Sequence, residues 1–541
     1  MAPKKKKIPT KSELVQLQRL YKTDEKIGER LGGVPAYLVA YWRRKKNVPK
    51  HSQPKFSEKE ILNLWERFGD DDKCGMELGI SKAAFYNWRR RYNIKEKPAF
   101  LKLEQLELNF PGLKLNSGSI SLYNKQTITQ KIISEKLDAD KVEIGESFEI
   151  EPDIVLSKGH AAELLQQFNA SNTDLVWNPN KIIVSLTVAK ENDQQHDPEA
   201  DKQLRDFVKR QGIKNFYEST VGFGQQVAIE HGQILPGQII LSSDNYASSL
   251  GAVAASAQSV PLSTIAESWS TGKTTVTIPE TIRVDLHGRR SRGVYCKDIA
   301  LAAIQKLRTV DVKNKAIEYY GNVISQMTIS ERFTLCNLSR DIGAVSAICS
   351  FDSVTRRYLT GRTQAQFMPV IADKNAEYAD LYQINIDKLP PQISNGNNES
   401  IKPAAEYENL AVQVIIIGTE SNGRFDDLRV AAEILKGKHV SPDCRLYIYP
   451  SSRSVYIEAL KKGLIRVLVE SGATIVFPGA HNIFETGSPF LAKGERALVT
   501  SNYSLIGSLD AEKSDVFICS PATAAAAAIN GTITDPSRFV K

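Results

Sequence analysis

The sequence predicts an α/β protein preceded by two small all-α modules, and three observations support this fold class. Buried-strand runs at 181–184 and 412–417 alternate with helical patterns at 427–435 and 454–464. The first 100 residues contain an internal repeat whose apolar residues follow helical spacing. The length of 541 residues is more than one domain usually contains.

The composition is typical of a globular protein, with 42% hydrophobic and 24% charged residues. The six cysteines lie far apart and form no Cys-x-x-Cys pair, which favours reduced thiols over a disulfide framework or a zinc ribbon. No apolar run approaches the ~20 residues of a membrane span, and no hydrophobic stretch follows the N-terminal lysines. We therefore expect no membrane partner and a cytoplasmic location, or a nuclear one in a eukaryote.

The charge is divided unevenly along the chain. Residues 1–100 carry 24 lysines and arginines against 12 acidic residues, whereas the other 441 carry 46 against 50. We call residues 1–97 the head and residues 118–541 the body. A basic head on a mildly acidic body predicts that only the head contacts a polyanion.

The head is an internal repeat that follows a basic tail at 1–10. Residues 13–32 align with 60–79, and Trp42-Arg43-Arg44 aligns with Trp88-Arg89-Arg90. The two units, 11–52 and 55–97, are too short for a large core, which suits compact helical modules.

Each unit is expected to form three helices. The second helix ends at a Leu-Gly pair, Leu31-Gly32 or Leu78-Gly79, and Ser81 is a suitable N-cap for the third helix of the second unit. A helix, a glycine-containing turn and a basic helix are typical of a helix-turn-helix, and residues 78–89 resemble the homeodomain-like modules of bacterial regulators and transposases.

This resemblance predicts a nucleic-acid interface on DNA or RNA. Side chains early in the third helix are expected to reach base edges, and basic side chains late in the helices are expected to bind phosphates. The first group is Ser81, Lys82 and Asn87, and the second group is Arg43, Arg44, Lys45, Lys46, Arg89, Arg90 and Arg91. A protein-docking helical module is the alternative for the head.

The body contains ten stretches whose order and spacing are specific enough to indicate a protein family. They are residues 127–133, 211–218, 234–238, 248–252, 276–288, 293–299, 332–344, 417–428, 500–502 and 520–528. Together they resemble the aconitase family, in particular the large subunit of 3-isopropylmalate dehydratase. The resemblance implies aconitase-type three-layer α/β/α domains over 118–541, joined to the head by a linker at 98–117. It also implies that the family's mobile C-terminal domain is absent and that a small subunit supplying it is a possible partner.

The resemblance also bears on the cofactor. The family holds a [4Fe–4S] cluster through one cysteine in Gly-Ser-Cys-Thr-Asn and two in Pro-Gly-Cys-x-x-Cys. The corresponding segments here start at Gly418 and Pro478, and they place Glu420, Ala480 and Ile483 at the three ligand positions. Because alanine and isoleucine have no donor atom, we expect no cluster, no other metal and no cofactor.

Five positions still match the family's catalytic region in kind, namely Asp244, Asn337, Asp341, Asn422 and Arg424. Other positions depart from it, because Gln225, Tyr246 and Tyr503 stand where the resemblance implies two histidines and an arginine. The matching residues are expected to cap helices and tie down loops, with a residual anion site as the alternative.

These observations favour a catalytically inactive, aconitase-like pseudoenzyme with tandem nucleic-acid-binding modules, acting as a regulator or a ligand-responsive scaffold. The first alternative is a hydro-lyase or isomerase of the 3-isopropylmalate dehydratase type with altered, cluster-free chemistry. The second alternative is a structural or partner-binding protein.

Overall fold

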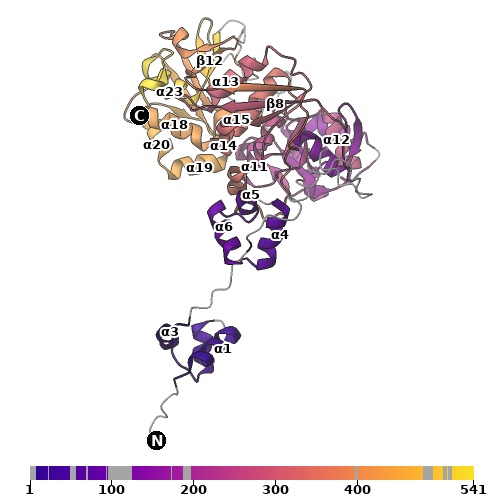
Figure 1. The fold of residues 1–541 in the computed structure, drawn as a ribbon. Coiled ribbons are helices and arrows are strands. Elements are labelled where there is room, and N and C mark those ends of the chain that lie inside the picture. The colour runs from indigo at the N-terminus through magenta and orange to yellow at the C-terminus, as the bar shows by residue number, and fades with distance from the viewer. Residues whose placement is uncertain are drawn as a thin grey trace, which may run out of the picture. The chain divides into compact units, whose positions relative to one another are not determined.

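The structure is a computed structural model. It describes residues 8–21, 23–48, 56–68, 71–92, 94, 125–171, 173–186, 197–396, 400–478, 491–503, 509 and 515–540. The chain divides into two compact units, Met1–Leu115 and Asn116–Lys541, and each is considered by itself (Figure 1). The linker expected at 98–117 lies outside the described residues, so the domain boundaries stay a prediction.

The described part of the first unit is helical, as the sequence predicts. The first repeat forms α1 (Lys11–Tyr21), α2 (Asp24–Arg30) and α3 (Ala36–Lys45). The second repeat forms α4 (Glu58–Phe68), α5 (Asp71–Glu77) and α6 (Lys82–Arg91). Each repeat buries its own small core, with Leu14, Ile27 and Val39 in one and Ile61, Cys74 and Phe85 in the other.

The middle helix of each repeat contains a glycine, and the structure gives the same reason for both. A Cβ atom on Gly28 would lie 2.0 Å from the Val34 carbonyl oxygen, and one on Gly75 would lie 2.9 Å from that of Ile80. The turn before the third helix thus passes directly over the glycine, where no side chain fits. This close approach explains why glycine stands at the same place in both repeats.

The first sheet of the body has five strands in the order β4-β3-β2-β5-β6, all parallel. The strands are β2 (Ile154–Lys158), β3 (Ile182–Ser185), β4 (Asn215–Tyr217), β5 (Ile239–Ser242) and β6 (Ser256–Ser259). One face packs against α9 (Ala161–Asn169), α10 (Pro198–Gln211) and α12 (Leu262–Thr271). The other packs against α11 (Gly224–Glu230), the 3₁₀ segment η3 (Ala247–Val253) and α15 (Ile329–Ser339). These helices on both faces give three layers.

Two further sheets complete the body. A parallel four-stranded sheet has the order β10-β9-β8-β11, with β8 (Thr281–His287), β9 (Ala316–Tyr320), β10 (Ser346–Cys349) and β11 (Asp380–Asn385). A seven-stranded sheet has the order β13-β12-β18-β17-β14-β15-β16 and is antiparallel at β12 and β13. Its strands are β12 (Gln392–Asn395), β13 (Ser400–Pro403), β14 (Val414–Gly418), β15 (Arg445–Tyr449), β16 (Thr474–Ile475), β17 (Arg496–Val499) and β18 (Asp515–Cys519).

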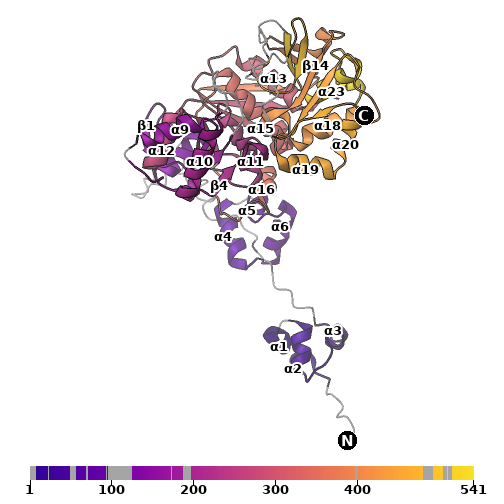
Figure 2. The same ribbon diagram turned by 180° about the vertical axis from the view of Figure 1, so that it is seen from behind.

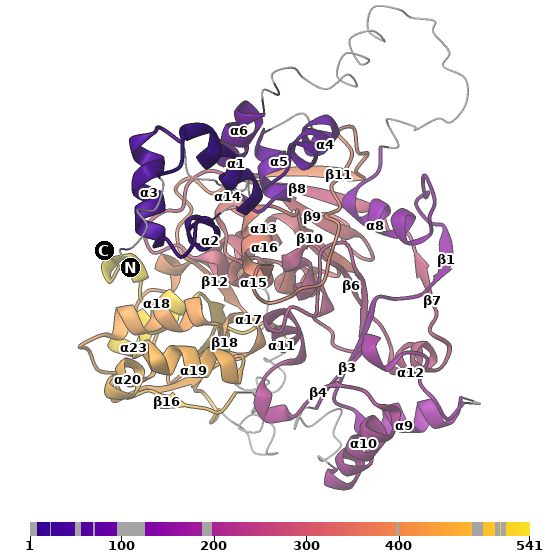
Figure 3. The same ribbon diagram turned by 90° about the horizontal axis from the view of Figure 1, so that it is seen from below.

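The helices of the body cover both faces of the seven-stranded sheet. Its outer face carries α18 (Phe425–Leu435), α19 (Arg453–Lys461), α20 (Leu464–Glu470) and α23 (Pro521–Asn530), as Figures 1 and 2 show. Its other face shares a core with α13 (Cys296–Leu307), α15 and the four-stranded sheet. Figure 3 shows α18–α20 and α23 at one end of the body and α9, α10 and α12 at the other.

The remaining elements are short. They include the antiparallel strand pair β1 (Ser147–Ile150) and β7 (Thr274–Thr277) and the helices α8 (Ile128–Lys136), α14 (Asn322–Gln326), α16 (Ser353–Leu359) and α17 (Thr419–Asn422). Within the residues that the structure describes, no helix combines the length and the apolar character needed to cross a bilayer. The α/β class predicted from the sequence is confirmed.

Candidate functional site

The candidate site of the body lies where parallel strands from two sheets end. Lys158 is the last residue of β2, and Asp244 follows the end of β5 by two residues. Glu420 lies in α17, directly after β14, and Asn502 follows β17. The carboxyl ends of parallel strands are the usual place for a ligand site in an open α/β sheet, because loops from several strands converge there.

An ammonium group joins two carboxylates at the centre of this site. Lys158 Nζ lies 2.6 Å from Asp244 Oδ2 and 3.6 Å from Glu420 Oε2. The Asp244 and Glu420 side chains are nearly inaccessible, whereas that of Lys158 is 21% exposed. Two buried carboxyl groups thus share one partly exposed ammonium group.

The other oxygen of each carboxylate is held by an amide. The backbone N–H of Tyr246 donates to Asp244 Oδ1 at 2.7 Å, and Asn502 Nδ2 donates to Glu420 Oε1 at 2.7 Å. The Asn502 amide also lies 3.4 Å from Asn337 Oδ1, and Asn337 Nδ2 donates to Ser249 Oγ at 3.0 Å. Both carboxylates are therefore fixed in orientation.

This environment separates the pKa values of the two acids. Burial raises the pKa of Glu420, and the nearby Asp244 charge adds to the effect although Lys158 opposes it. Burial alone would also raise the pKa of Asp244, but the Lys158 ammonium and the hydrogen bond from the Tyr246 N–H outweigh it, so this pKa is lowered. One ionised carboxylate beside a more easily protonated one is a common arrangement for acid–base chemistry.

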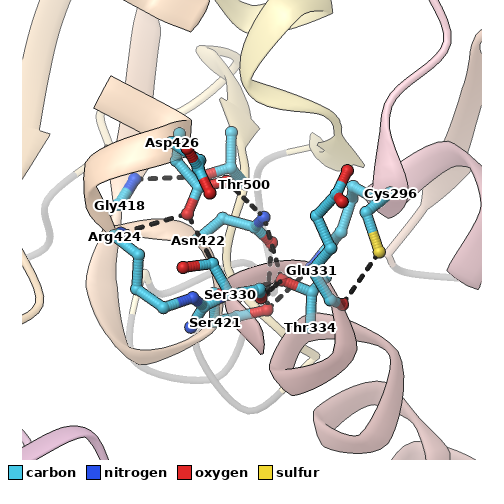
Figure 4. A network of polar contacts seen from close by, with 12 residues as sticks. Cys296, Ser330, Glu331, Thr334, Gly418, Ser421, Asn422, Arg424, Asp426 and Thr500 are labelled. Atoms are coloured by element: carbon cyan, nitrogen blue, oxygen red, sulfur yellow. Dashed lines mark hydrogen bonds and ion pairs between the residues drawn. The ribbon is translucent and has the colours of Figure 1, made fainter. Parts of the chain in front are cut away.

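Arg424 and Asn422 tie down the loop that carries Glu420. Arg424 Nη1 donates to the Glu420 carbonyl at 3.0 Å, and its Nη2 donates to the Ser421 carbonyl and to Thr334 Oγ1. Asn422 Nδ2 donates to Thr334 Oγ1 at 3.2 Å and to Asp427 Oδ1 at 2.9 Å. Figure 4 shows Arg424 and Asn422 beside Ser421 and Thr334, which fits the expected loop-fixing role.

Asp341 belongs to a neighbouring branch of the network. Tyr246 Oη donates to Asp341 Oδ1 at 2.8 Å, and burial raises the pKa of Asp341 to about 6. Tyr246 therefore contacts two of the predicted carboxylates, Asp244 through its backbone and Asp341 through its ring hydroxyl. All five family-matching residues lie in or next to one polar network.

Sequence reasoning missed two lysines in this region. Lys158 is one, and the fully buried Lys297 is the other, donating to Ser421 Oγ at 3.1 Å and to the Ser501 carbonyl at 2.7 Å. Burial lowers the pKa of Lys297 to about 7. A possible sequence signal for Lys158 was a lysine that directly ends the buried run 154–157.

A cavity of about 280 Å³ lies beside the Asn422 network, at the start of α13, α15 and α18. Its walls include three cationic and three anionic side chains, namely Arg290, Lys297, Arg429, Glu331, Asp426 and Asp427. Cationic and anionic side chains thus line the cavity in equal number, and we assign it no ligand.

Comparison with known proteins places the body. The profile of the aconitase family (aconitate hydratase) matches residues 165–402 and 397–531. The 3-isopropylmalate dehydratase large subunit 1 of Methanopyrus kandleri is 34% identical over 417 residues, which are 77% of this chain and 100% of that protein. The chain belongs to the aconitase family.

Two other relatives give the same result. The 3-isopropylmalate dehydratase large subunit of a Thermoanaerobacter species is 33% identical over 76% of this chain and 98% of its own length. A probable methanogen homoaconitase large subunit of Methanosarcina mazei is 34% identical over 69% of this chain and 95% of its own length. The expected resemblance of the body is confirmed. These relatives do not support an inactive body and favour the hydro-lyase alternative.

The aconitase-family assignment corrects the cofactor expectation. Members of this family and the 3-isopropylmalate dehydratases normally carry a [4Fe–4S] cluster, so the prediction of a cofactor-free protein is wrong as it stands. The error lay in treating the replacement of three ligand cysteines as proof that no cofactor binds. Ala480 and Ile483 lie outside the described residues. The carboxylate of Glu420 contacts Lys158 and Asn502 and is no thiolate, so we assign it no cluster-binding role and derive no step through a cluster.

Two arginines predicted to bind phosphates are used inside the head. Both nitrogens of the Arg43 fork, Nε and Nη2, donate to Asp24 at 3.0 Å, and its Nη1 donates to the Val48 carbonyl. Arg89 repeats this arrangement with Asp71 and the Ile94 carbonyl. This differs from the prediction, because each guanidinium fastens the third helix to the second within its own repeat.

The other predicted contact residues divide into two groups. Ser81 caps α6 by accepting from the Ala84 N–H at 3.2 Å, and Lys46 donates to the Pro9 carbonyl. The remaining six side chains are exposed on the third helices or at their ends, namely Arg44, Lys45, Lys82, Asn87, Arg90 and Arg91. Tyr37, Tyr41 and Tyr86 are exposed among them. Aromatic and basic side chains thus share this surface in each repeat.

Proposed function

We propose that the body is a hydro-lyase that removes water from a hydroxylated di- or tricarboxylic acid, as the names of its dehydratase and homoaconitase relatives suggest. The observation that carries the proposal is the joining of Asp244 and Glu420 by Lys158 at the carboxyl ends of strands from two sheets. Family membership supplies the reaction class, and this polar centre supplies groups suited to it.

The dehydration reaction requires one proton acceptor and one proton donor. Dehydration breaks a C–H bond next to a carboxylate and a C–O bond on the neighbouring carbon, forms a C=C bond and releases water. In our proposal Asp244, which is held in its ionised form beside Lys158, accepts the carbon-bound proton. Glu420, whose pKa is raised, gives a proton to the departing hydroxyl. The fixed orientation of both carboxylates suits such a division of roles.

A small subunit is the proposed partner of the body. The relatives are named large subunits, and the chain covers 95–100% of the length of the three described above. A large subunit of this kind is expected to need its small subunit for full activity. The test therefore adds a small subunit from one of these relatives and compares turnover with and without it.

The activity assay uses the full-length chain, as purified and after anaerobic incubation with iron and sulfide. Formation of the unsaturated acid from 3-isopropylmalate or homocitrate is followed by its ultraviolet absorbance. We expect turnover with at least one of these acids. Absence of turnover under all conditions, with a folded protein, would refute the hydro-lyase assignment and leave the scaffold or partner-binding alternatives.

A second function is proposed for the head, namely binding of DNA or RNA. It is favoured by the six exposed polar and basic residues on the third helices, together with the exposed tyrosines beside them. Basic side chains neutralise phosphates, and aromatic rings can stack on bases. Arg43 and Arg89 orient the third helices instead of contacting nucleic acid. Affinity for the full chain should fall as salt rises, and a flat salt dependence would leave the head as a protein-docking module.

A further inference from the structure

The charge balance around Lys158 points to a role that the family assignment does not supply. Asp244 is 3% exposed and Glu420 is 8% exposed, and both approach the same ammonium group. Two carboxylates this close in a buried site repel each other strongly unless a cation lies between them. Lys158 supplies that cation from the end of β2.

The two carboxylates belong to different sheets of the body. Asp244 follows β5 of the five-stranded sheet, and Glu420 follows β14 of the seven-stranded sheet. Lys158 belongs to the same sheet as Asp244, because β2 and β5 are paired in parallel. Its contact with Glu420 therefore reaches from one sheet to a loop of the other.

The other charged side chains around the pair make bonds of their own. Asp341 accepts from Tyr246, Arg424 donates to the Glu420 carbonyl, and Lys297 donates to Ser421 and Ser501. Asn502, which donates to Glu420 Oε1, and Asn337, which accepts from Asn502, are neutral. The two carboxylates thus have no second ammonium or guanidinium in contact with their oxygens within the described residues.

We propose that Lys158 is a positioning residue that assembles the site, by holding the carboxylates of Asp244 and Glu420 at one point. The assembly is a property of the chain and does not depend on turnover. Its consequence for catalysis rests on the proposed function, because it is the placement of the acceptor Asp244 and the donor Glu420 that Lys158 secures.

The first test measures thermal unfolding of the full-length chain between pH 5 and pH 8. Lys158→Met removes the cation and keeps a long side chain, and Lys158→Arg keeps the charge. Lys181→Met is the matched control, because Lys181 pairs with Glu151 Oε1 at 2.6 Å beside the same sheet and away from Asp244 and Glu420. Lys158→Met is expected to lower the unfolding midpoint by about 5 °C at pH 8.

The pattern across variants decides the outcome. The deficit of Lys158→Met should shrink toward pH 5, where protons replace the lost ammonium, and Lys158→Arg and Lys181→Met should stay within about 2 °C of the native chain. Glu420→Gln added to Lys158→Met should restore about half of the loss or more, because a single carboxylate then remains. A pH-independent deficit, or a double variant no better than Lys158→Met, overturns the proposal.

Two further arms keep the result decisive. If Lys158→Met does not fold, recovery of a folded double variant with Glu420→Gln supports the proposal, and an unfolded double variant overturns it. With 3-isopropylmalate and a small subunit, Lys158→Met should lower kcat by about 100-fold with a small change in KM, and Lys158→Arg should restore much of it. An inactive native chain would defeat the proposed function alone, whereas an active one unaffected by Lys158→Met would overturn the role of Lys158.

Discussion

The arginine–aspartate pairs of the head and the Lys158 contacts of the body differ in how well their charges are satisfied. In the head, each of Arg43 and Arg89 meets one carboxylate through two parallel bonds and uses its third nitrogen on a carbonyl. In the body, the single ammonium of Lys158 is shared by Asp244 and Glu420. The head pairs are balanced, whereas in the body two carboxyl groups share one ammonium group.

This difference in charge satisfaction indicates a structural role for the arginine pairs of the head and a chemical role for the Lys158 site of the body. A balanced bidentate pair fixes geometry and leaves neither partner to react. Two buried carboxyl groups that share one ammonium group lower the stability of the fold, because one of them lacks a cation of its own. Such an arrangement shifts pKa values, and shifted pKa values are common at sites that transfer protons. The same reasoning that removes Arg43 and Arg89 from the predicted nucleic-acid contacts therefore adds Lys158 to the candidate active site.

The largest expected effect concerns activity. Asp244→Asn removes the proposed proton acceptor while keeping the shape and the hydrogen bond from the Tyr246 N–H. We expect kcat for dehydration to fall by about 100-fold or more, since general base catalysis contributes that much. Asp341→Asn is the matched comparison and should have a smaller effect, because Asp341 contacts Tyr246 and not Lys158 in the described structure. Equal losses for the two variants would argue against the assignment of Asp244.

The next effect concerns the balanced pair of the second repeat. Arg89→Met leaves the Asp71 carboxylate without its partner and the Ile94 carbonyl without its donor. We expect a loss of about 3 kcal/mol in the local stability of this repeat. Hydrogen–deuterium exchange of peptides from 71–92 in the full chain measures it, with Arg90→Met, an exposed neighbour, as the control. Similar exchange in both variants would show that the Asp71 pair contributes little.

A smaller effect is expected at the surface of the same helix. Arg90→Ala together with Arg91→Ala removes two exposed cations and leaves the Arg89–Asp71 pair intact. If both contact phosphates of duplex DNA, the slope of log affinity against log salt should become shallower by about 1.8. Titration of the full chain at several salt concentrations checks this. An unchanged slope would place the interface elsewhere or support protein docking.

The sequence predicted the head and the sheets for a clear reason. Helical spacing in a repeat and long apolar runs are local signals, and both survive in the structure as α1–α6 and as strands such as β14. The pairs Arg43–Asp24 and Arg89–Asp71 bridge 19 and 18 residues, so spacing alone does not show them. The repeat held an unused signal, because each unit has both the aspartate and the arginine at equivalent places.

The candidate site was predicted only in part. Asp244, Asn337, Asp341, Asn422 and Arg424 were found because family motifs mark them, and the structure brings them into one network. Lys158 was missed because it lies in none of the stretches that resemble the family. Comparison with the family motifs shows which motif residues are replaced, and it does not show a charged residue outside the motifs. Its contact with Glu420 joins two sheets, and only the three-dimensional fold brings these residues together.

The smallest expected effect is a change in stability when the Glu420 carboxylate is removed. Glu420→Gln leaves Lys158 and Asp244 as a balanced pair and keeps a side chain of the same length beside Asn502. Because the pKa of Glu420 is raised in the folded state, its ionised form destabilises the fold as pH rises through and above the pKa of the unfolded chain. The variant should therefore be more stable than the native chain at pH 8 by about 1 kcal/mol, and this gain should vanish toward pH 4, where the native carboxyl is protonated. Urea unfolding at both pH values measures the difference.

The corresponding change in the head, Asp71→Asn, should instead destabilise its repeat at pH 8, because there the carboxylate and the guanidinium balance each other. A loss of stability at pH 8 in both variants would show that the Lys158 site is as well satisfied as the arginine pairs, and the distinction between the two regions would fall.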